Sequence, residues 1–133
     1  MKYIAAITLI LNATIAHADV FSDSVNKYAQ EVYKTNAEIG KTKLSPDRLH
    51  AATLFIIIDD GSNSGSQFMM RSEYINGRYT PTSYTLVGSG YNFYIDGVDV
   101  TNAATILTGK LSVVDDAHCC PSNPIKIAIK HTN

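Results

Sequence analysis

Asn76-Gly77 constrains the fold more than any other pair, because it joins two runs of alternating residues. Both central residues of a type I′ turn need positive φ, which Asn-Gly supplies readily. Arg78 to Val87 therefore returns as an antiparallel partner of Gln67 to Ile75. Pro81 lacks an N–H, so this second strand is expected at a sheet edge or bulged there. The first strand alternates two faces, with Phe68, Met70 and Tyr74 on one and Met69, Arg71 and Glu73 on the other.

Other segments of strand length surround this hairpin. Thr53 to Ile58 is a β-branched apolar run suited to a central strand. Tyr91 to Ile95 and Val98 to Val100 flank an expected Asp96-Gly97 turn, and Ala104 to Val114 holds one or two strands around Thr108-Gly109-Lys110. The final strand alternates Ile125, Ile127 and Ile129 with Lys126, Ala128 and Lys130. Local connections favour an antiparallel meander of about six short strands.

One amphipathic helix is predicted ahead of the strands, from Val20 to Ile39, with Gly40 as its stop. Its apolar residues recur mostly at three- and four-residue steps: Phe21, Val25, Tyr28, Ala29, Val32 and Ile39. The expected fold class is α+β, with this helix packed on the meander. A partner-binding helix is the alternative. Ser45-Pro46-Asp47 looks like the start of a second, brief helix.

Residues 1–18 have the pattern of a cleavable secretory signal peptide, with cleavage expected after Ala18. Lys2 supplies a positive charge, an apolar run follows, and Ala16-His17-Ala18 forms the cleavage pattern. A membrane anchor is the alternative, but the run is shorter than the roughly 20 residues needed to cross a bilayer. We therefore expect a single mature domain, residues 19–133, that spans no membrane and is periplasmic or secreted.

The charge balance excludes two classes of partner. Without Lys2, ten of the eleven basic residues remain against twelve acidic ones, which leaves no basic footprint for nucleic acid and no polybasic membrane patch.

No enzyme motif accompanies His50, His118 or His131, so no catalytic residue and no cofactor are expected. Residues 59–65 resemble a calcium loop but place Gly61 where a ligand belongs, which favours a turn.

Cys119-Cys120 is the unusual pair, inside a loop expected over Asp115 to Pro124. Outside the cytoplasm thiols tend to be oxidised, and adjacent cysteines close only a strained ring, because their Cα atoms sit about 3.8 Å apart. A structural vicinal disulfide is the first interpretation. Intermolecular pairing, free thiols and a redox role are the alternatives. A metal site with His118 and Asp115 or Asp116 lacks the usual ligand spacing, so no metal is expected.

Residues 116–122 read D-x-x-C-C-P-S, and this segment resembles small secreted bacterial proteins of the LppP/LprE type. The resemblance covers residues 50–131 and includes the strand Leu54–Ile58 and the loop Asp60–Ser66. It implies a fold rather than a function, and this chain lacks the lipid-attachment cysteine of that type. In format alone, a leader followed by a small chain is also similar to accessory proteins of type IVb (bundle-forming) pilus clusters that assist the outer-membrane secretin.

Two functional hypotheses follow. The first is a non-enzymatic periplasmic interaction protein with protein partners in the cell envelope, such as an assembly accessory of a type IV pilus and its secretin. It draws on the expected strand edge near Pro81, to which another chain can pair. The second is a secreted small-ligand-binding or redox module centred on Cys119-Cys120. The aromatic residues of the meander form either core pairs or a binding face: Tyr74, Tyr79, Tyr84, Tyr91, Phe93 and Tyr94.

Overall fold

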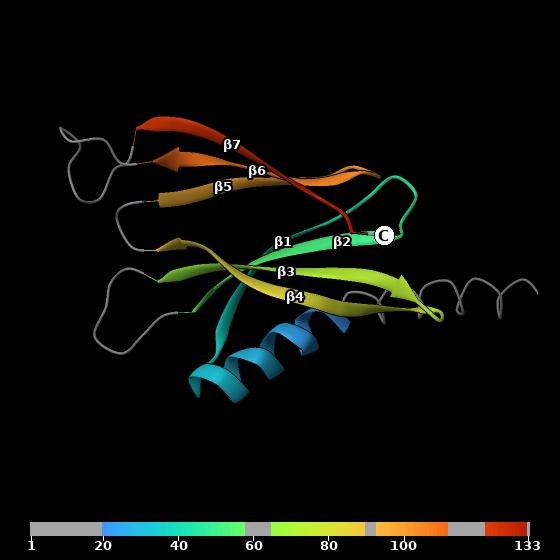
Figure 1. Cartoon of the computed structure of the whole chain (residues 1–133). Coiled ribbons are helices and arrows are strands. Elements are labelled where there is room, and N and C mark those ends of the chain that lie inside the picture. The colour runs from blue at the N-terminus through green and yellow to red at the C-terminus, as the bar shows by residue number, and fades with distance from the viewer. Residues whose placement is uncertain (1–19, 58–64, 90–92, 112–121, 133) are drawn as a thin grey trace, which may run out of the picture.

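The computed structural model describes residues 20–57, 65–89, 93–111 and 122–132 (Figure 1). In these residues, one helix is followed by seven antiparallel strands in two sheets. The fold is therefore α+β, as the sequence predicts, although the strands do not form one meander. Sheet A has the order β1-β2-β3-β4 and sheet B the order β5-β6-β7. The strand bounds are β1 (Ala37–Leu44), β2 (His50–Ile57), β3 (Ser66–Ile75), β4 (Arg78–Ser89), β5 (Phe93–Val100), β6 (Ala104–Leu111) and β7 (Asn123–Lys130).

The N-terminal helix is shorter than predicted. It is α-helical over residues 20–28 and continues as one π-helical turn, η1 (Ala29–Tyr33). Lys34 then adopts a left-handed conformation (φ 57°), which ends the helix before Gly40 is reached. The predicted last turn instead belongs to β1, which pairs with β2. A bulge between Ile39 and Thr42 interrupts the alternation of β1, so its sequence carries no clear strand period.

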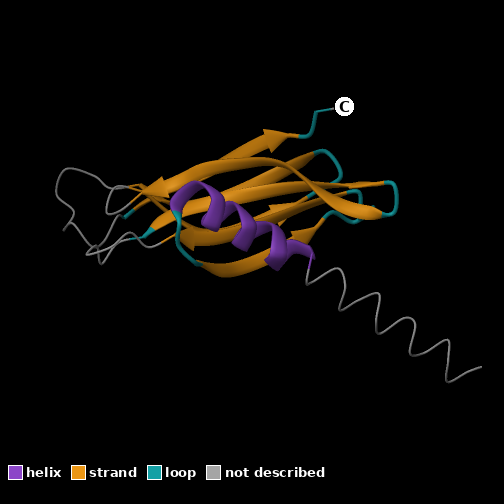
Figure 2. Cartoon of the chain, turned by 90° about the horizontal axis from the view of Figure 1, so that it is seen from below, coloured by secondary structure: helices purple, strands orange, loops and turns teal. Residues whose placement is uncertain are grey.

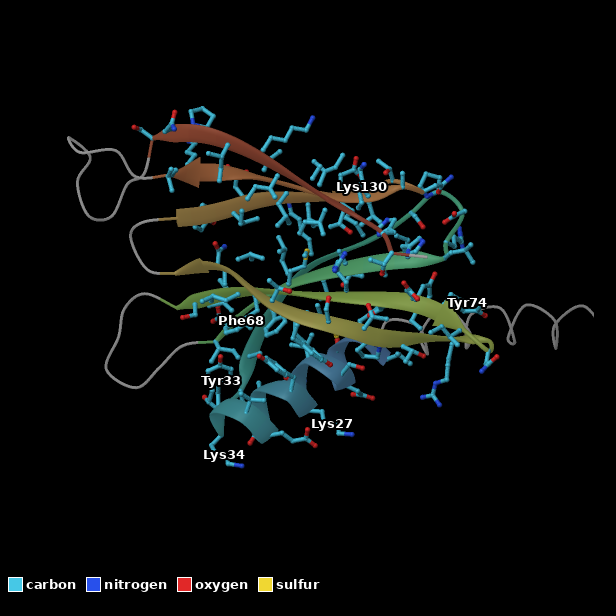
Figure 3. All side chains as sticks on the ribbon, viewed as in Figure 1. Lys27, Tyr33, Lys34, Phe68, Tyr74 and Lys130 are labelled. Carbon is cyan, nitrogen blue, oxygen red and sulfur yellow. The ribbon has the colours of Figure 1, made fainter. Side chains whose placement is uncertain are left out.

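The π-helical turn also changes which side chains face the sheet. A π-helix has more residues per turn than an α-helix, so side chains after Ala29 are rotated relative to the α-helical pattern. Tyr33 is brought to the sheet, where its ring lies 5.5 Å from that of Phe68 (Figure 3). Val32, predicted on the apolar face, is 55% exposed instead.

The helix covers one face of sheet A (Figures 1 and 2). Three buried helix residues form one side of this core: Phe21, Val25 and Ala29. They pack on alternate residues of β2 and β3 and on one residue of β4, and these strand residues are Ala51, Phe55, Ile57, Phe68, Met70 and Tyr79. The predicted two faces of β3 are confirmed, because Phe68 and Met70 belong to the helix side whereas Met69 belongs to a second core.

Sheet B covers the opposite face of sheet A. Ala52 of β2 and Met69 of β3 pack there against Ile95, Val98, Val100 and Leu107 of sheet B. Burial of these apolar groups contributes about 25 cal/mol per Å² to folding. Sheet A is thus the middle layer of three, which a meander with one covering helix does not provide.

The β3–β4 hairpin forms as predicted. Asn76 and Gly77 both have positive φ, 53° and 84°, and Ile75 pairs with Arg78. β4 is an edge strand of sheet A, and Pro81 lies beside a register shift between Arg71 and Ser72 of β3. Both features expected from a proline without an N–H are therefore present.

Three further expectations were wrong in detail. Asp96-Gly97 is no turn but a bulge inside the continuous strand β5, because Ile95 pairs with Gly109 and Gly97 with Thr108. The loop expected to run to Pro124 ends earlier, since β7 begins at Asn123. Ser45-Pro46-Asp47 starts a tight turn between β1 and β2, closed by the bond from Arg48 N–H to the Ser45 carbonyl at 2.9 Å. Proline suits the second position of such a turn as well as the first turn of a helix.

Gly109 is required by a close approach of two backbones. A Cβ there would collide with the Tyr94 carbonyl oxygen and lie 3.0 Å from Ile95 Cα. We predict that Gly109→Ala lowers the free energy of unfolding by about 1–3 kcal/mol, the usual cost of overpacking. Urea denaturation measures this, with Thr108→Ala at the exposed neighbouring position as the control. Equal stability of the two variants would contradict the close approach.

Thr105 of β6 is fully buried, and its hydroxyl has no hydrogen-bond partner among the described residues. A buried hydroxyl without a partner keeps its desolvation cost. We expect Thr105→Val, which replaces the hydroxyl by a methyl group of similar size, to raise the free energy of unfolding by about 1 kcal/mol. Thr53→Val is the contrasting variant, because Thr53 is buried but bonds to Thr42 through their hydroxyls at 2.9 Å; it should destabilise.

Candidate functional site

The structure places two of the four described meander tyrosines, Tyr79 and Tyr84, in or against the core. Tyr84 stacks on Tyr28 of the helix, with ring centroids 4.1 Å apart and planes at 2°, and its hydroxyl donates to the Ser24 carbonyl at 3.3 Å. Tyr79 is buried, and its hydroxyl donates to the Arg48 carbonyl at 2.8 Å. Burial raises the pKa of both phenols above the ordinary value. These two rings hold the helix on sheet A and are not a binding face.

The other aromatic residues do not form a continuous patch. Tyr74 is exposed beside Tyr79, with ring centroids 5.0 Å apart. Tyr94 is exposed on β5 of the other sheet. Tyr91 lies outside the described residues, and Phe93 opens β5. An aromatic binding face along the meander, one of the two interpretations of the sequence, is therefore not what the described tyrosines form.

Two histidines meet although the sequence gives no sign of it. His50 begins β2 and His131 follows β7, and their rings stack with centroids 3.8 Å apart and planes at 4°. A ring nitrogen of His131 lies 3.0 Å from the Thr101 carbonyl oxygen. We call Ser45, Asp47, His50, Asn102 and His131 the polar corner, because they connect the β1–β2 turn with the end of sheet B. No local motif signals a contact between residues so distant in sequence.

Asp47 organises the turn side of the polar corner. Its Oδ1 accepts hydrogen bonds from the Ser45 hydroxyl at 2.6 Å and from the Leu49 N–H at 3.0 Å. Its own N–H donates to Asn102 Oδ1 at 2.9 Å, which joins the turn to sheet B. The Ser45 hydroxyl, followed by the Leu49 amide, holds the pKa of Asp47 below its ordinary value. These bonds are what a turn-forming carboxylate makes.

The arrangement around the two histidines favours a structural role. Beside them, the Arg71 Nε–H donates to the Ser83 hydroxyl at 3.2 Å, and the Thr82 hydroxyl donates to the Arg71 carbonyl at 3.2 Å. Polar groups beside the two histidines thus bond to one another, as Ser45, Asp47 and Asn102 do within the polar corner. Among the described residues, no group of three or more histidine, cysteine, aspartate or glutamate residues is placed to hold a metal ion.

Several predicted site residues lie outside the described residues. These are the two cysteines proposed as a vicinal disulfide, the histidine and aspartates of the alternative metal site, and nearly all of the calcium-like loop: Cys119, Cys120, His118, Asp115, Asp116 and residues 59–64. The disulfide and the redox module centred on it stay predictions.

Two grooves larger than the hollow beside the histidines occur in the described part of the chain. One of about 230 Å³ lies between β1 and β5 and is lined by Ile39, Leu54 and Tyr94 among others. The other, of about 310 Å³, lies beside the β1–β2 turn and is lined by Leu44, Leu49 and Tyr74 among others. Pockets that bind small ligands are commonly about 300–1,000 Å³, so these grooves are at or below the lower end of that range.

The open strand edges are the remaining candidate for a functional surface. Among the described strands, β1 and β4 end sheet A, and β5 and β7 end sheet B. An edge strand presents unpaired N–H and C=O groups to which another chain can add a strand. β7 pairs with β6 over its whole length, from Asn123 opposite Leu111 to Lys130 opposite Ala104, with no register shift. It therefore offers an edge without register shifts over eight residues, in which Pro124 at the second position has no N–H to donate.

β4, the edge recognised from the sequence, is less regular. Register shifts fall beside Pro81 and again near Gly88, so its regular stretches are four residues long, over 78–81 and 83–86. Bulges and proline are devices that prevent pairing at an edge. The structure thus confirms that the strand of Pro81 is at an edge, and it adds β7 as the longer regular one.

Comparison with family models, with curated proteins and with solved structures gives no match for this chain. In the described residues, no helix is both long enough and apolar enough to cross a membrane.

The lowered pKa of Asp47 predicts a pH dependence of folding. A carboxyl group with a depressed pKa stabilises the folded state above its unfolded pKa, near 3.8, and this contribution is lost as pH falls through the folded value. We expect Asp47→Asn to have a lower free energy of unfolding than wild type at neutral pH, and this difference to shrink as the pH falls below the unfolded pKa. Urea denaturation of both proteins at neutral and acidic pH measures the difference.

Ser45→Ala provides the control for this effect, because the Ser45 hydroxyl is the main cause of the shift. In the Ser45→Ala background, the pH dependence of the Asp47→Asn difference should become smaller. An unchanged pH dependence in that background would show that the hydroxyl does not stabilise the carboxylate.

Proposed function

We propose that this chain is a non-enzymatic interaction protein of the cell envelope, acting as an assembly accessory of a machine such as a type IV pilus and its outer-membrane secretin. The observation that carries the proposal is the regular open edge of β7. Strand addition to such an edge gives affinity through main-chain hydrogen bonds, and specificity through alternate side chains. The leader pattern of residues 1–18 supports the location, and the near-neutral charge agrees with a protein partner.

The burial of side chains on β7 also supports a contact role. Ile127 lies on the face of β7 opposite Lys126 and Lys130, which is the face toward sheet A. Its side chain is nevertheless 38% exposed. Ile129, on the same face, packs against the core between the sheets. An added strand would cover Ile127 and continue that core outward, so β7 gains apolar contacts together with main-chain hydrogen bonds.

The test is made in the bacterium that carries the gene. Deletion should reduce the heat-stable secretin multimers seen by immunoblot and the surface pili seen by electron microscopy, and the wild-type gene should restore both. We expect Ile127→Lys to fail in restoring them, because a charge that points toward the inner face of an edge strand opposes strand addition.

Ile39→Lys is the matched control. Ile39 lies on the bulged edge strand β1 and is 37% exposed, close to the value for Ile127, so the two substitutions have similar solvent access. The control should restore secretin and pili. Wild-type amounts of secretin multimers and pili in the deletion strain would exclude this function.

A further inference from the structure

β7 differs from the other open edges in how it is protected. β1 carries a bulge, and β4 carries Pro81 and two register shifts. The backbone of β5 is already bonded at Ile95. The Gln67 side chain accepts from the Ile95 N–H at 2.8 Å and donates to the Ile95 carbonyl at 2.9 Å. β7 has no register shift along its pairing with β6. Among the described residues, β7 is protected by Pro124 near its start and otherwise by the charge of its lysines.

The charges of β7 lie on one face. Lys126 and Lys130 are exposed and alternate with the isoleucines. Lys110 of β6 shares their face, since it pairs with Pro124, two residues from Lys126. Figure 3 shows Lys130 on the side of the molecule opposite the helix residues Lys27 and Lys34. A strand added to β7 would therefore meet lysines along one face and isoleucines along the other.

We propose that β7 binds an extended segment of a partner protein whose residues alternate between acidic and apolar. The acidic side chains would lie beside Lys126 and Lys130, and the apolar ones beside Ile127 on the face toward sheet A. Opposite charges across paired strands stabilise a sheet, and like charges destabilise it. This inference rests on the proposed function in using β7 as the contact edge, and it adds the chemistry of the partner.

A second copy of this chain does not meet the requirement. Pairing of β7 with β7 of another copy would gather both copies' Lys126 and Lys130 at one junction, which like-charge repulsion opposes. Uncharged segments gain no charge pairing there. The lysines therefore act as a filter, since they weaken pairing with neutral or basic strands and favour acidic ones.

The experiment uses two capped peptides of the length of β7, eight residues. One alternates valine with glutamate, and the other alternates valine with lysine. We expect the glutamate peptide to bind the mature protein with micromolar affinity by isothermal titration calorimetry, and the lysine peptide to bind at least about tenfold more weakly. Hydrogen exchange followed by NMR should show protection gained at β7 amides.

A charge reversal tests the residues directly. Lys126→Glu together with Lys130→Glu should reverse the preference between the two peptides. The matched control is Lys27→Glu on the exposed side of the helix together with Lys34→Glu at its C-cap, which changes the net charge equally, and it should keep the wild-type preference. Both pairs are exposed, and circular dichroism checks that the variants fold.

Three outcomes would overturn the proposal: no binding of the glutamate peptide at millimolar concentration, new protection on β1 or β4 instead of β7, or an equal effect of the helix control. The result is separable from the secretin test. Peptide binding at β7 without a secretin phenotype would leave the edge chemistry intact and remove the secretin role. A secretin phenotype without peptide binding would leave the secretin role intact and remove the proposed edge chemistry.

Discussion

The two-sided burial of β2 and β3 is the constraint on which the rest of the structure depends. Along β2, Ala51, Phe55 and Ile57 pack toward the helix, whereas Ala52 and Leu54 pack toward sheet B. A strand that is apolar on both faces must be covered on both. The helix and sheet B are these covers, so the chain builds three layers.

The sequence predicted those features that depend on neighbouring residues. The Asn76-Gly77 hairpin, the two faces of β3 and the edge position of the Pro81 strand follow from turn chemistry and alternation, and all are present. The helix was correct at its start but not at its end. No residue type in the sequence indicates the π-helical turn. The left-handed Lys34 is equally unmarked, because lysine rarely adopts positive φ.

The parts that could not be predicted depend on contacts between distant segments. Asp96-Gly97 has the composition of a turn, yet β5 passes through it as a bulge because both sides pair with β6. The division into two sheets is equally hidden, since the lack of pairing between β4 and β5 leaves no mark on either strand. The meeting of His50 and His131 follows only once sheet B lies over sheet A. Of the candidate surface, the isoleucine and lysine alternation of β7 was visible, whereas its open, unbulged edge required the topology.

The same topology explains why charge is the protection left to β7. A bulge needs an extra residue that the partner strand can accommodate, and Gln67 reaches β5 because that strand lies against sheet A. β7 is separated from β5 by β6, and Ile127 is only partly covered. A bulge excludes nearly every added strand, whereas two lysines on one face exclude by charge alone. Protection by charge is therefore also a means of selection, and the edge that remains regular is the one whose side chains distinguish one strand from another.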